Sequence, residues 1–450
     1  MSLSDRILQP LLRDPASPAA PGIADDRIGV FAEVKDELHR RLVDRLDLKN
    51  IETLSPERVR EEIRSVVVSM VGSSRVPLSQ VERERLVQDL LDEVTGLGPL
   101  EPLLRDQSIC DILVNTYSTI YVERAGKLEL TRARFDSNEH LLRIITRIVS
   151  RVGRRVDETS PMVDARLPDG SRVNAIIPPL AIDGPVLSIR RFGRSPLRVR
   201  ELLALGSVTK EAIAFLGACV CAKLNVLVSG GTGTGKTTFL NALSAFIPRT
   251  ERIVTIEDSA ELLLQQPHVV RLETRPANVE GKGEILARDL VRNSLRMRPD
   301  RIIVGEVRGG EILDMLQAMN TGHEGSMTTI HANSPRDALT RLEAMIGMGG
   351  VPISETASRQ MISRAIHLLV HLTRGTDGRR RLASICEVTG TEATTISMQE
   401  IFQFQQRGTD PHGRVFGDYA FTGIRPLAME QVQRSGIDPA RILEGHLREA

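Results

Sequence analysis

The spacing of apolar positions changes along the chain, and its N-terminal part shows two different patterns. Residues 1–26 contain the stretch PASPAAPG and no sustained periodicity, which predicts a disordered tail. Residues 27–95 place apolar side chains at helical spacing in three successive pieces, which predicts a small three-helix bundle. Such a bundle is either an interaction module or a packing extension of the next domain, and the sequence leaves both interpretations open.

Helix-start signals locate the three predicted helices. The first is expected at roughly 28–47. The second begins at Ser55-Pro56, where a capping residue precedes a proline in the first turn. The third begins at Ser79, and Glu82 three residues later has the spacing of a capping box.

Between residues 96 and 202 the apolar period shortens to that of β-strands. A break at TGLGPLEPLL ends the helices, and Asp169-Gly170 is a hairpin signal. One clear helix, HLLRIITRIVSRVG, lies among the predicted strands CDILVN, TIYVER, KLELT, RVNAIIPP and VLSIRRF. The pattern predicts a small α+β domain.

From residue 203 to residue 450 strands alternate with helices, which predicts a mainly parallel sheet covered on both faces. Helices are expected from Thr237, from Gly310 and from Ser334-Pro335. The expected strands are LNVLVS, RIVTIE, HVVRL, RIIVGE, GSMTTIH, IHLLVHL and LASICEVT. The last fifty residues are less regular and are treated as a C-terminal extension of this domain.

A glycine-rich loop stands between the first of these strands and the helix that follows it. The loop meets the pattern G-x-x-x-x-G-K-[ST], whose backbone N–H groups and helix N-terminus bind phosphate. Lys236 can reach the β- and γ-phosphates, and the Thr237 hydroxyl can bind Mg²⁺. The predicted nucleotide-binding residues are Gly230, Gly231, Thr232, Gly233, Thr234, Gly235, Lys236, Thr237 and Thr238.

Two acidic sites follow predicted strands, at the edge of the sheet where ligands of such folds bind. One is Glu257-Asp258, and the other is Glu306. Gly305 occupies the place where an aspartate usually follows the apolar run. We therefore expect Thr237 and waters to hold Mg²⁺, with Glu306 touching the metal's water shell or polarising the attacking water.

Two histidines and a group of arginines complete the candidate site. His331 ends a predicted strand and can bind the γ-phosphate, whereas His323 is equally well explained as a polar core or loop residue. Arg166, Arg172, Arg190 and Arg191 lie near strand ends of the upstream α+β domain. A supplied arginine is worth roughly 10³–10⁵ in the rate of phosphoryl transfer, so these residues predict catalysis on domain closure.

Composition excludes several classes of function. Lys and Arg number 59 against 58 Asp and Glu, and aromatic residues make up 3%, which disfavours a surface that binds nucleic acid. The four cysteines form no C-x-x-C pair, so neither a zinc site nor a disulfide framework is expected. We find no signal peptide and no apolar run of membrane-spanning length, so we expect a cytoplasmic protein that reaches a membrane only through partners.

The segments GGTGTGKT, TIEDSAEL, RMRPDRIIVGEVRGGE and TGHEGSMTTIHAN resemble the four signatures of the secretion ATPase superfamily, in the same order. These signatures are the P-loop, the Asp box, an atypical second Walker motif and the His box. Upstream, LLDEVTGLGPLEPLLRD, CDILVNTYSTIYVERAGKL, ARLPDGSRVNAIIPP and LSIRRF resemble the CpaF-type tight-adherence (Tad) pilus ATPases. The four-cysteine zinc element of pilus-extension and type II ATPases is missing, which disfavours those branches.

The resemblance implies a RecA-like P-loop core, an ATP- and Mg²⁺-dependent reaction and a homo-hexameric ring. It implies that Glu257 and Glu306 handle the water, without deciding which is the base, and that His331 contacts the γ-phosphate. Arg172, Arg190 and Arg191 would close over the phosphates, with Arg308 adjacent. The motor would drive an inner-membrane platform protein that adds or removes pilin subunits.

Two other functions share the P-loop core. A nucleic-acid translocase or strand-exchange protein would need a basic, aromatic-bearing channel, against which the charge balance and scarce aromatics argue. A small-molecule kinase fits neither the set of four signatures nor the second domain.

Overall fold

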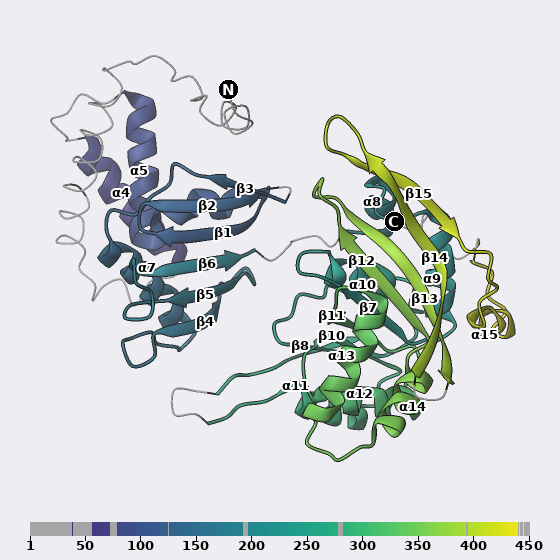
Figure 1. The fold of residues 1–450 in the computed structure, drawn as a ribbon. Helices are drawn as coiled ribbons and strands as arrows, with labels where there is room; N and C mark the ends of the chain where they lie inside the picture. The colour runs from purple at the N-terminus through teal and green to yellow at the C-terminus, as the bar shows by residue number, and fades with distance from the viewer. Residues whose placement is uncertain are drawn as a thin grey trace, which may run out of the picture. The chain divides into compact units, whose positions relative to one another are not determined.

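Two β-sheets and the helices around them make up most of the chain that the structure describes (Figure 1). The computed structural model describes residues 38, 56–72, 79–124, 126–191, 197–277, 282–392, 395–439, 441 and 444. The tail expected at 1–26 therefore lies outside the described residues. Of the helix expected at 28–47, only Leu38 is described, and it is helical and buried.

The helical region contains the second and third predicted helices. Helix α4 spans Pro56–Gly72 and begins at the expected proline. Helix α5 spans Gln80–Thr95, and the capping box at its start is present. The Ser79 backbone N–H donates to Glu82 at 2.8 Å, and the Ser79 hydroxyl accepts from the Glu82 N–H at 3.3 Å. A short 3₁₀ turn, η1 (Gly98–Leu100), and helix α6 (Glu101–Arg105) follow.

The apolar faces of α4 and α5 pack against each other because both helices repeat apolar residues every three or four positions. Their buried cluster comprises Leu38, Ile63, Val67, Met70, Val71, Leu86, Leu90 and Leu91.

The first sheet has six strands in the order β3-β2-β1-β6-β5-β4. Its strands are β1 (Ile109–Thr116), β2 (Thr119–Arg124), β3 (Lys127–Leu130), β4 (Met162–Arg166), β5 (Arg172–Ile176) and β6 (Val186–Arg190). Asp169-Gly170 turns the chain between β4 and β5, which pair antiparallel from Arg166 opposite Arg172. The predicted helix is α7 (Asn138–Arg151), and β4 was not among the expected strands.

The second sheet has nine strands in the order β15-β14-β13-β12-β7-β11-β10-β8-β9. The pairs from β12 to β9 are parallel, and the three remaining pairs are antiparallel, so the sheet is mainly parallel as predicted. The strands of the parallel part are β7 (Val226–Gly230), β8 (Ile253–Glu257), β9 (Val269–Glu273), β10 (Arg301–Val307), β11 (Met327–His331) and β12 (Leu368–Arg374).

Helices cover both faces of this sheet. They are α8 (Val199–Ala204), α9 (Lys210–Cys221), α10 (Lys236–Ser244), α11 (Ala287–Ser294) with the 3₁₀ turn η2 (Leu295–Met297), α12 (Glu311–Asn320), α13 (Pro335–Met348) and α14 (Glu355–Ala365). Three of them begin as expected, with Gly310 and Ser334 as the N-cap residues of α12 and α13.

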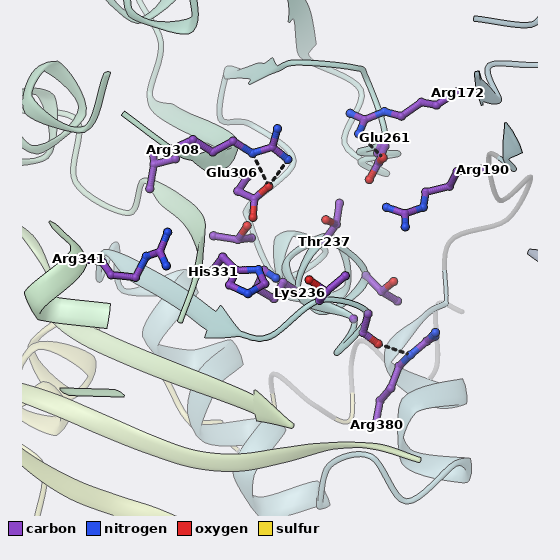
Figure 2. A pocket seen from close by; sticks show the side chains of 16 residues that line it. Arg172, Arg190, Lys236, Thr237, Glu261, Glu306, Arg308, His331, Arg341 and Arg380 are labelled. Carbon is purple, nitrogen blue, oxygen red and sulfur yellow. Dashed lines mark hydrogen bonds and ion pairs between the residues drawn. The ribbon is translucent and has the colours of Figure 1, made fainter. Parts of the chain in front are cut away.

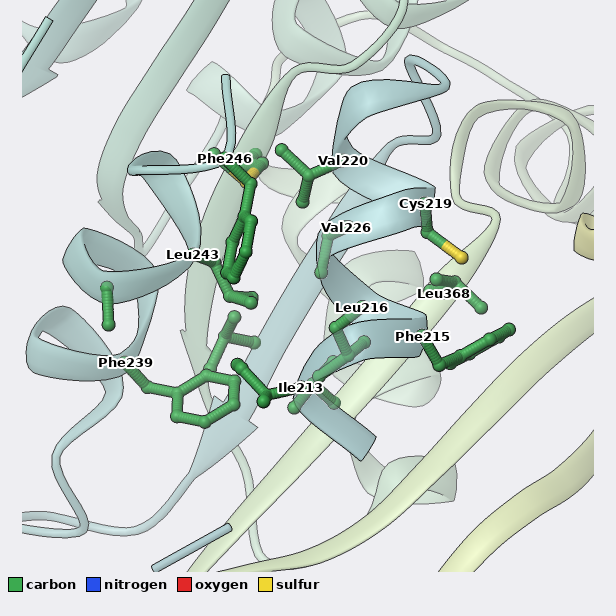
Figure 3. Close-up of a cluster of buried hydrophobic side chains, with 14 of the residues drawn as sticks. Ile213, Phe215, Leu216, Cys219, Val220, Val226, Phe239, Leu243, Phe246 and Leu368 are labelled. Carbon is green, nitrogen blue, oxygen red and sulfur yellow. The ribbon is translucent and has the colours of Figure 1, made fainter. Parts of the chain in front are cut away.

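The two faces of the sheet belong to two separate cores, because successive side chains of a strand point to opposite sides. On β7, Val226 and Val228 lie in one buried cluster and Leu227 lies in the other. Figure 3 shows the first cluster, where Phe215 and Leu216 of α9 and Phe239 of α10 lie around the central strands. A fully buried strand of this kind reads as a continuous apolar run, which explains why LNVLVS was recognisable in the sequence.

The C-terminal part of the chain is more regular than the sequence suggested. Strand β13 (Arg380–Glu392), which contains the expected strand LASICEVT, continues the sheet beyond β12. It pairs antiparallel with β14 (Thr395–Thr409), which was not expected. Strand β15 (Val415–Phe421) is the edge strand, and helix α15 (Ala428–Arg434) follows. Ile401, Phe402 and Val432 from this region lie in the same core as the P-loop strand.

Contacts within the chain divide it into two units. The first contains residues 1–107, 117–119 and 132–144, and the second contains 108–116, 120–131 and 145–450. The division expected from the sequence, into 27–95, 96–202 and 203–450, is not tested by this grouping and stays a prediction.

Candidate nucleotide site

The four sequence signatures meet at one edge of the nine-stranded sheet. Strands β7, β11, β10 and β8 are neighbours in that order and run parallel. The P-loop follows β7, His331 ends β11, Glu306 lies at the end of β10, and Glu257 ends β8. Because the carboxyl ends of parallel strands share one edge, segments separated by up to a hundred residues are brought together.

The loop after β7 has the backbone shape that phosphate binding requires. Gly235 is the N-cap residue of α10 and has a φ of 90°, a left-handed conformation that residues with a Cβ rarely adopt. Helix α10 begins at Lys236, so its N-terminal N–H groups are directed toward the loop. The Lys236 ammonium group donates to the Gly231 carbonyl at 2.9 Å. This contact holds the lysine across the loop.

A cavity of about 600 Å³ opens in front of this loop (Figure 2). It brings together most of the residues predicted for the site, from the loop, from Glu306 and His331 and from the first sheet. Its lining residues are Arg172, Arg190, Thr232, Gly233, Gly235, Lys236, Thr237, Thr238, Glu261, Glu306, Val307, Arg308, Thr329, His331, Arg341 and Arg380. Of the predicted residues, those outside this lining are Gly230, Gly231, Thr234, Arg191 and Glu257.

The cavity is strongly basic. Its lining includes five arginines and Lys236 but only two carboxylates, Glu261 and Glu306. Burial lowers the pKa of Lys236, the nearby carboxylate of Glu306 raises it, and the Arg308 guanidinium lowers it further, with a net fall. An excess of cations in a partly enclosed site favours a polyanionic ligand.

The Glu306 side chain, near the C-terminal end of β10, is held by Arg308, two residues later in the chain. Arg308 donates to Glu306 through Nε at 2.8 Å and through Nη2 at 2.5 Å, and also contacts Asp258 at 3.2 Å. Both donors bind the same carboxylate oxygen, Oε2, and the carboxylate faces the cavity beside Lys236 (Figure 2).

Glu257 occupies a different environment from Glu306 and does not line the cavity. Its side chain is buried, and one oxygen accepts the backbone N–H groups of Glu261 and Leu262 at 2.8 and 2.9 Å. Burial raises its pKa, and these hydrogen bonds offset the increase only in part. The structure thus shows Glu257 holding the segment after β8, while Glu306 faces the cavity.

The arginines of the first sheet also differ in whether they line the cavity. Arg172 contacts Glu261 at 3.2 Å and the Ser259 carbonyl at 3.2 Å, and Arg190 contacts Asp111 at 3.2 Å. Both line the cavity. Arg191 points elsewhere, because its guanidinium donates to the Ile109 carbonyl at 3.4 Å.

The two histidines of the His box lie at opposite ends of β11. His331 ends the strand beside the P-loop, in register with Gly230. His323 precedes the strand, and its carbonyl accepts the Ser326 hydroxyl at 2.7 Å. Of the two histidines, only His331 lines the cavity. This agrees with the interpretation of His323 as a polar core or loop residue.

Three charged lining residues were missed by the sequence analysis. They are Glu261, Arg341 on α13 and Arg380 at the start of β13, whose Nε donates to the Gly233 carbonyl at 2.9 Å. A signal existed for Arg341, since α13 was predicted from Ser334-Pro335 and follows His331 directly. No local signal places Arg380 beside the loop, because β13 reaches it only through the order of strands in the sheet.

A second cavity of about 390 Å³ adjoins the first and shares Gly235, Thr238 and Arg380 with it. Its walls include the apolar residues Leu197, Leu202, Leu205, Phe239, Leu372 and Leu382. The two cavities together offer a basic compartment beside an apolar one, which suits the phosphates and the base of a nucleotide.

The donor set also suits a magnesium ion. Thr237 lies in the first turn of α10 and Glu306 is the last but one residue of β10, and both line the same cavity. A hydroxyl and a carboxylate beside bound phosphates are the ligands Mg²⁺ prefers, with water completing its shell.

Comparison with known proteins agrees with this geometry. A family model described as "Type II/IV secretion system protein" matches residues 93–420, and "Type II secretion system protein E, N-terminal domain" matches residues 31–95. The chain belongs to the type II/IV secretion system protein family.

Relatives of this family member include proteins of conjugation and secretion. It is 42% identical over 302 residues to a putative conjugal transfer protein of Mycobacterium tuberculosis, covering 66% of this chain and 85% of the relative. It is 32% identical to the type IV secretion system protein VirB11 of Brucella suis, covering 63% of this chain and 87% of VirB11. The crystal structure of the Brucella suis VirB11 ATPase with sulphate is 28% identical in sequence. The alignment covers 64% of this chain and 94% of the VirB11 chain, with a TM-score of 0.34.

None of the helices in the described part of the chain is long and apolar enough to cross a bilayer.

Proposed function

We propose that this protein is a P-loop ATPase motor that hydrolyses ATP to ADP and phosphate to power assembly of a tight-adherence, type IV-like pilus. The motor works as a homo-hexamer in the cytoplasm and reaches the inner membrane through a platform protein. Retraction of the same pilus is compatible with the site.

One observation carries the ATPase assignment. The P-loop, Glu306 and His331 converge on a single cavity lined by five arginines and one lysine. A phosphate-binding loop alone fits many nucleotide-binding proteins. A carboxylate and a histidine beside the loop, within an excess of positive charge, are the groups that phosphoryl transfer to water needs.

The residues divide the work as follows. The P-loop N–H groups and Lys236 hold the β- and γ-phosphates, and Thr237 with Glu306 would hold Mg²⁺, which neutralises phosphate charge. Glu306 orients and polarises the attacking water. His331 binds the γ-phosphate, and Arg172 and Arg190 cover the charge that develops on its oxygens.

The assignment to pilus assembly rests on the upstream part of the chain. The predicted upstream helical bundle and the GLGPLEPLL stretch favour the Tad branch over the type IV secretion ATPases. Conjugal or type IV secretion is the second candidate function, because the conjugal transfer relative is similar to this chain. The similarity extends over only about two thirds of this chain.

The ATPase activity is tested by replacing the P-loop lysine. Lys236→Ala should abolish ATP turnover while the circular dichroism spectrum stays that of the folded wild type. The ammonium group stabilises transferring phosphate charge, and its loss leaves the fold's packing unchanged. Undiminished turnover in this variant would remove the P-loop from the mechanism.

The biological role needs a separate test. Chromosomal Lys236→Ala should remove surface pili seen by electron microscopy and leave conjugal transfer frequency unchanged. Loss of transfer with normal pili would favour the second candidate. Purified wild-type protein should turn over ATP faster with its co-encoded platform protein, and light scattering gives the mass of the ring.

A further inference from the structure

Arg341 lies in the nucleotide cavity without a role in the mechanism above. It is on α13, the helix that follows the His box strand, ten residues after His331. In the view of Figure 2 it reaches in from the side of His331 and Glu306, whereas Arg190 and Arg380 lie on the other side of Lys236. Arg341 lines the cavity together with these residues.

The other four arginines of the cavity already have partners. Arg308 is bound to Glu306, Arg172 to Glu261 and Arg190 to Asp111. Arg380 donates to the Gly233 carbonyl. Both carboxylates of the lining are therefore engaged by arginines other than Arg341.

Arg341 itself makes no hydrogen bond or ion pair with any residue in the described part of the chain. Asp337, one turn earlier, has the spacing of a helical ion pair, but its carboxylate instead accepts the Asn333 backbone N–H at 2.8 Å. The guanidinium group thus presents its donors to the cavity.

Packing does not require an arginine at this position. The core side of α13 consists of Ala338, Leu339, Leu342, Met345 and Ile346. Arg341 is exposed beside this stripe, so its replacement should leave the helix folded. An arginine with unengaged donors, facing a basic cavity from a fixed helix, is suited to bind a phosphoryl group.

We propose that Arg341 binds the γ-phosphoryl group of ATP from the side of His331 and so distinguishes ATP from ADP. The proposal rests on the ATPase function proposed above. The P-loop holds the phosphates from the start of α10, and Glu306 marks the side from which water attacks. A group beside Glu306 and His331 faces the terminal phosphate rather than the α-phosphate. Because α13 packs on the same sheet that carries the loop, this contact forms as soon as ATP binds.

The test compares nucleotide affinities of Arg341→Gln and wild-type full-length protein by calorimetry. The probes are ADP and the non-hydrolysable β,γ-imido analogue of ATP, each with Mg²⁺. One lost charge-assisted contact should weaken the ATP analogue about tenfold or more and ADP less than about twofold. Arg341→Lys should recover part of the difference, and kcat for ATP should fall in Arg341→Gln.

The matched control is Arg364→Gln on α14, an exposed arginine outside both cavities, which should bind both nucleotides as wild type does. Equal affinities in Arg341→Gln and wild type, or an equal loss for ADP and the ATP analogue, would overturn the proposal. So would a loss that appears only together with a lower assembled mass by light scattering. Failure of the wild type itself to bind or hydrolyse ATP would instead refute the proposed function.

Discussion

At the scale of single residues, the structure gives a physical reason for the glycine in the second Walker motif. A Cβ at Gly305 would lie 3.0 Å from Cγ of Glu257, closer than ordinary van der Waals contact. The Gly305 carbonyl also accepts the Thr329 hydroxyl at 2.7 Å. The Asp box glutamate thus packs directly on the backbone of the second Walker strand, so the two motifs constrain each other.

Replacement of Gly305 should therefore disturb this packing. Gly305→Ala is expected to lower the free energy of unfolding by about 1–3 kcal/mol, because the added methyl group overfills the site. Thermal or urea unfolding measures the change. Gly347→Ala on α13 is the matched control, since no atom outside its chain neighbours and its own helix backbone lies within 4 Å of its Cβ position, and it should be neutral or slightly stabilising. A Gly305→Ala protein as stable as wild type would contradict the packing argument.

The two glutamates should differ in their effect on catalysis. Glu306→Ala is expected to bind ATP but to hydrolyse it at least about 10²-fold slower, because the cavity loses its water-facing carboxylate. Steady-state ATPase assays with a separate measurement of nucleotide binding test this. Wild-type turnover would make Glu257 the water-handling residue, despite its burial and its hydrogen bonds to Glu261 and Leu262.

At the scale of elements, helix starts were predictable because capping is a local interaction. Ser79 with Glu82, and Ser334 with Pro335, are neighbours in sequence, and both helices begin where these residues indicate. Strand β14 was not predicted, since an antiparallel strand near a sheet edge needs only a weak alternation of apolar and polar residues. Its buried residues, Ile396, Ile401 and Phe402, acquire an apolar environment from distant segments.

A buried histidine links α5 to the start of α7. His140 contacts Glu93 at 2.5 Å through Nε2 and Asp136 at 2.9 Å through Nδ1. Burial opposes the charged form, but the two carboxylates outweigh it and raise the pKa of His140 to about 9. The folded state therefore holds a proton that the unfolded chain releases near its ordinary pKa of 6.5.

This proton makes stability depend on pH. The raised pKa stabilises the fold fully below about pH 6.5, and the contribution is lost as the pH rises toward about 9. Urea unfolding followed by helical circular dichroism should show this fall. His140→Gln should remove the pH dependence in this window and destabilise the helical region by about 3–5 kcal/mol, because Glu93 loses its buried partner. An unchanged pH profile in the variant would exclude His140 as the group responsible.

At the scale of the whole molecule, the cavity joins residues from the two sheets. Arg172 begins β5 and Arg190 ends β6 of the first sheet, while the P-loop follows β7 of the second. In the proposed mechanism, these arginines couple hydrolysis to mechanical work.

Arg190 provides the test of this coupling. Arg190→Ala is expected to lower kcat by about 10³-fold or more and to change ATP affinity little, since in the proposed mechanism the arginine covers charge that develops in the transition state. Kinetics and equilibrium binding separate the two effects. Arg143→Ala, an exposed arginine on α7 outside the cavity, serves as the control. A change in affinity alone would show that Arg190 only binds nucleotide.

The sequence by itself determined the features that depend on short-range chemistry. These are the P-loop between a strand and a helix, the helix caps, the apolar runs of a strand buried on both faces, and the four signatures in order. Tertiary structure alone decided how those signatures are arranged. Chain order is P-loop, Asp box, second Walker motif and His box, but strand order places His331 beside the loop and Glu257 farthest away. Strand pairing between distant segments sets that order, and so it brings Glu306, His331 and Arg380 to the cavity while Glu257 packs elsewhere.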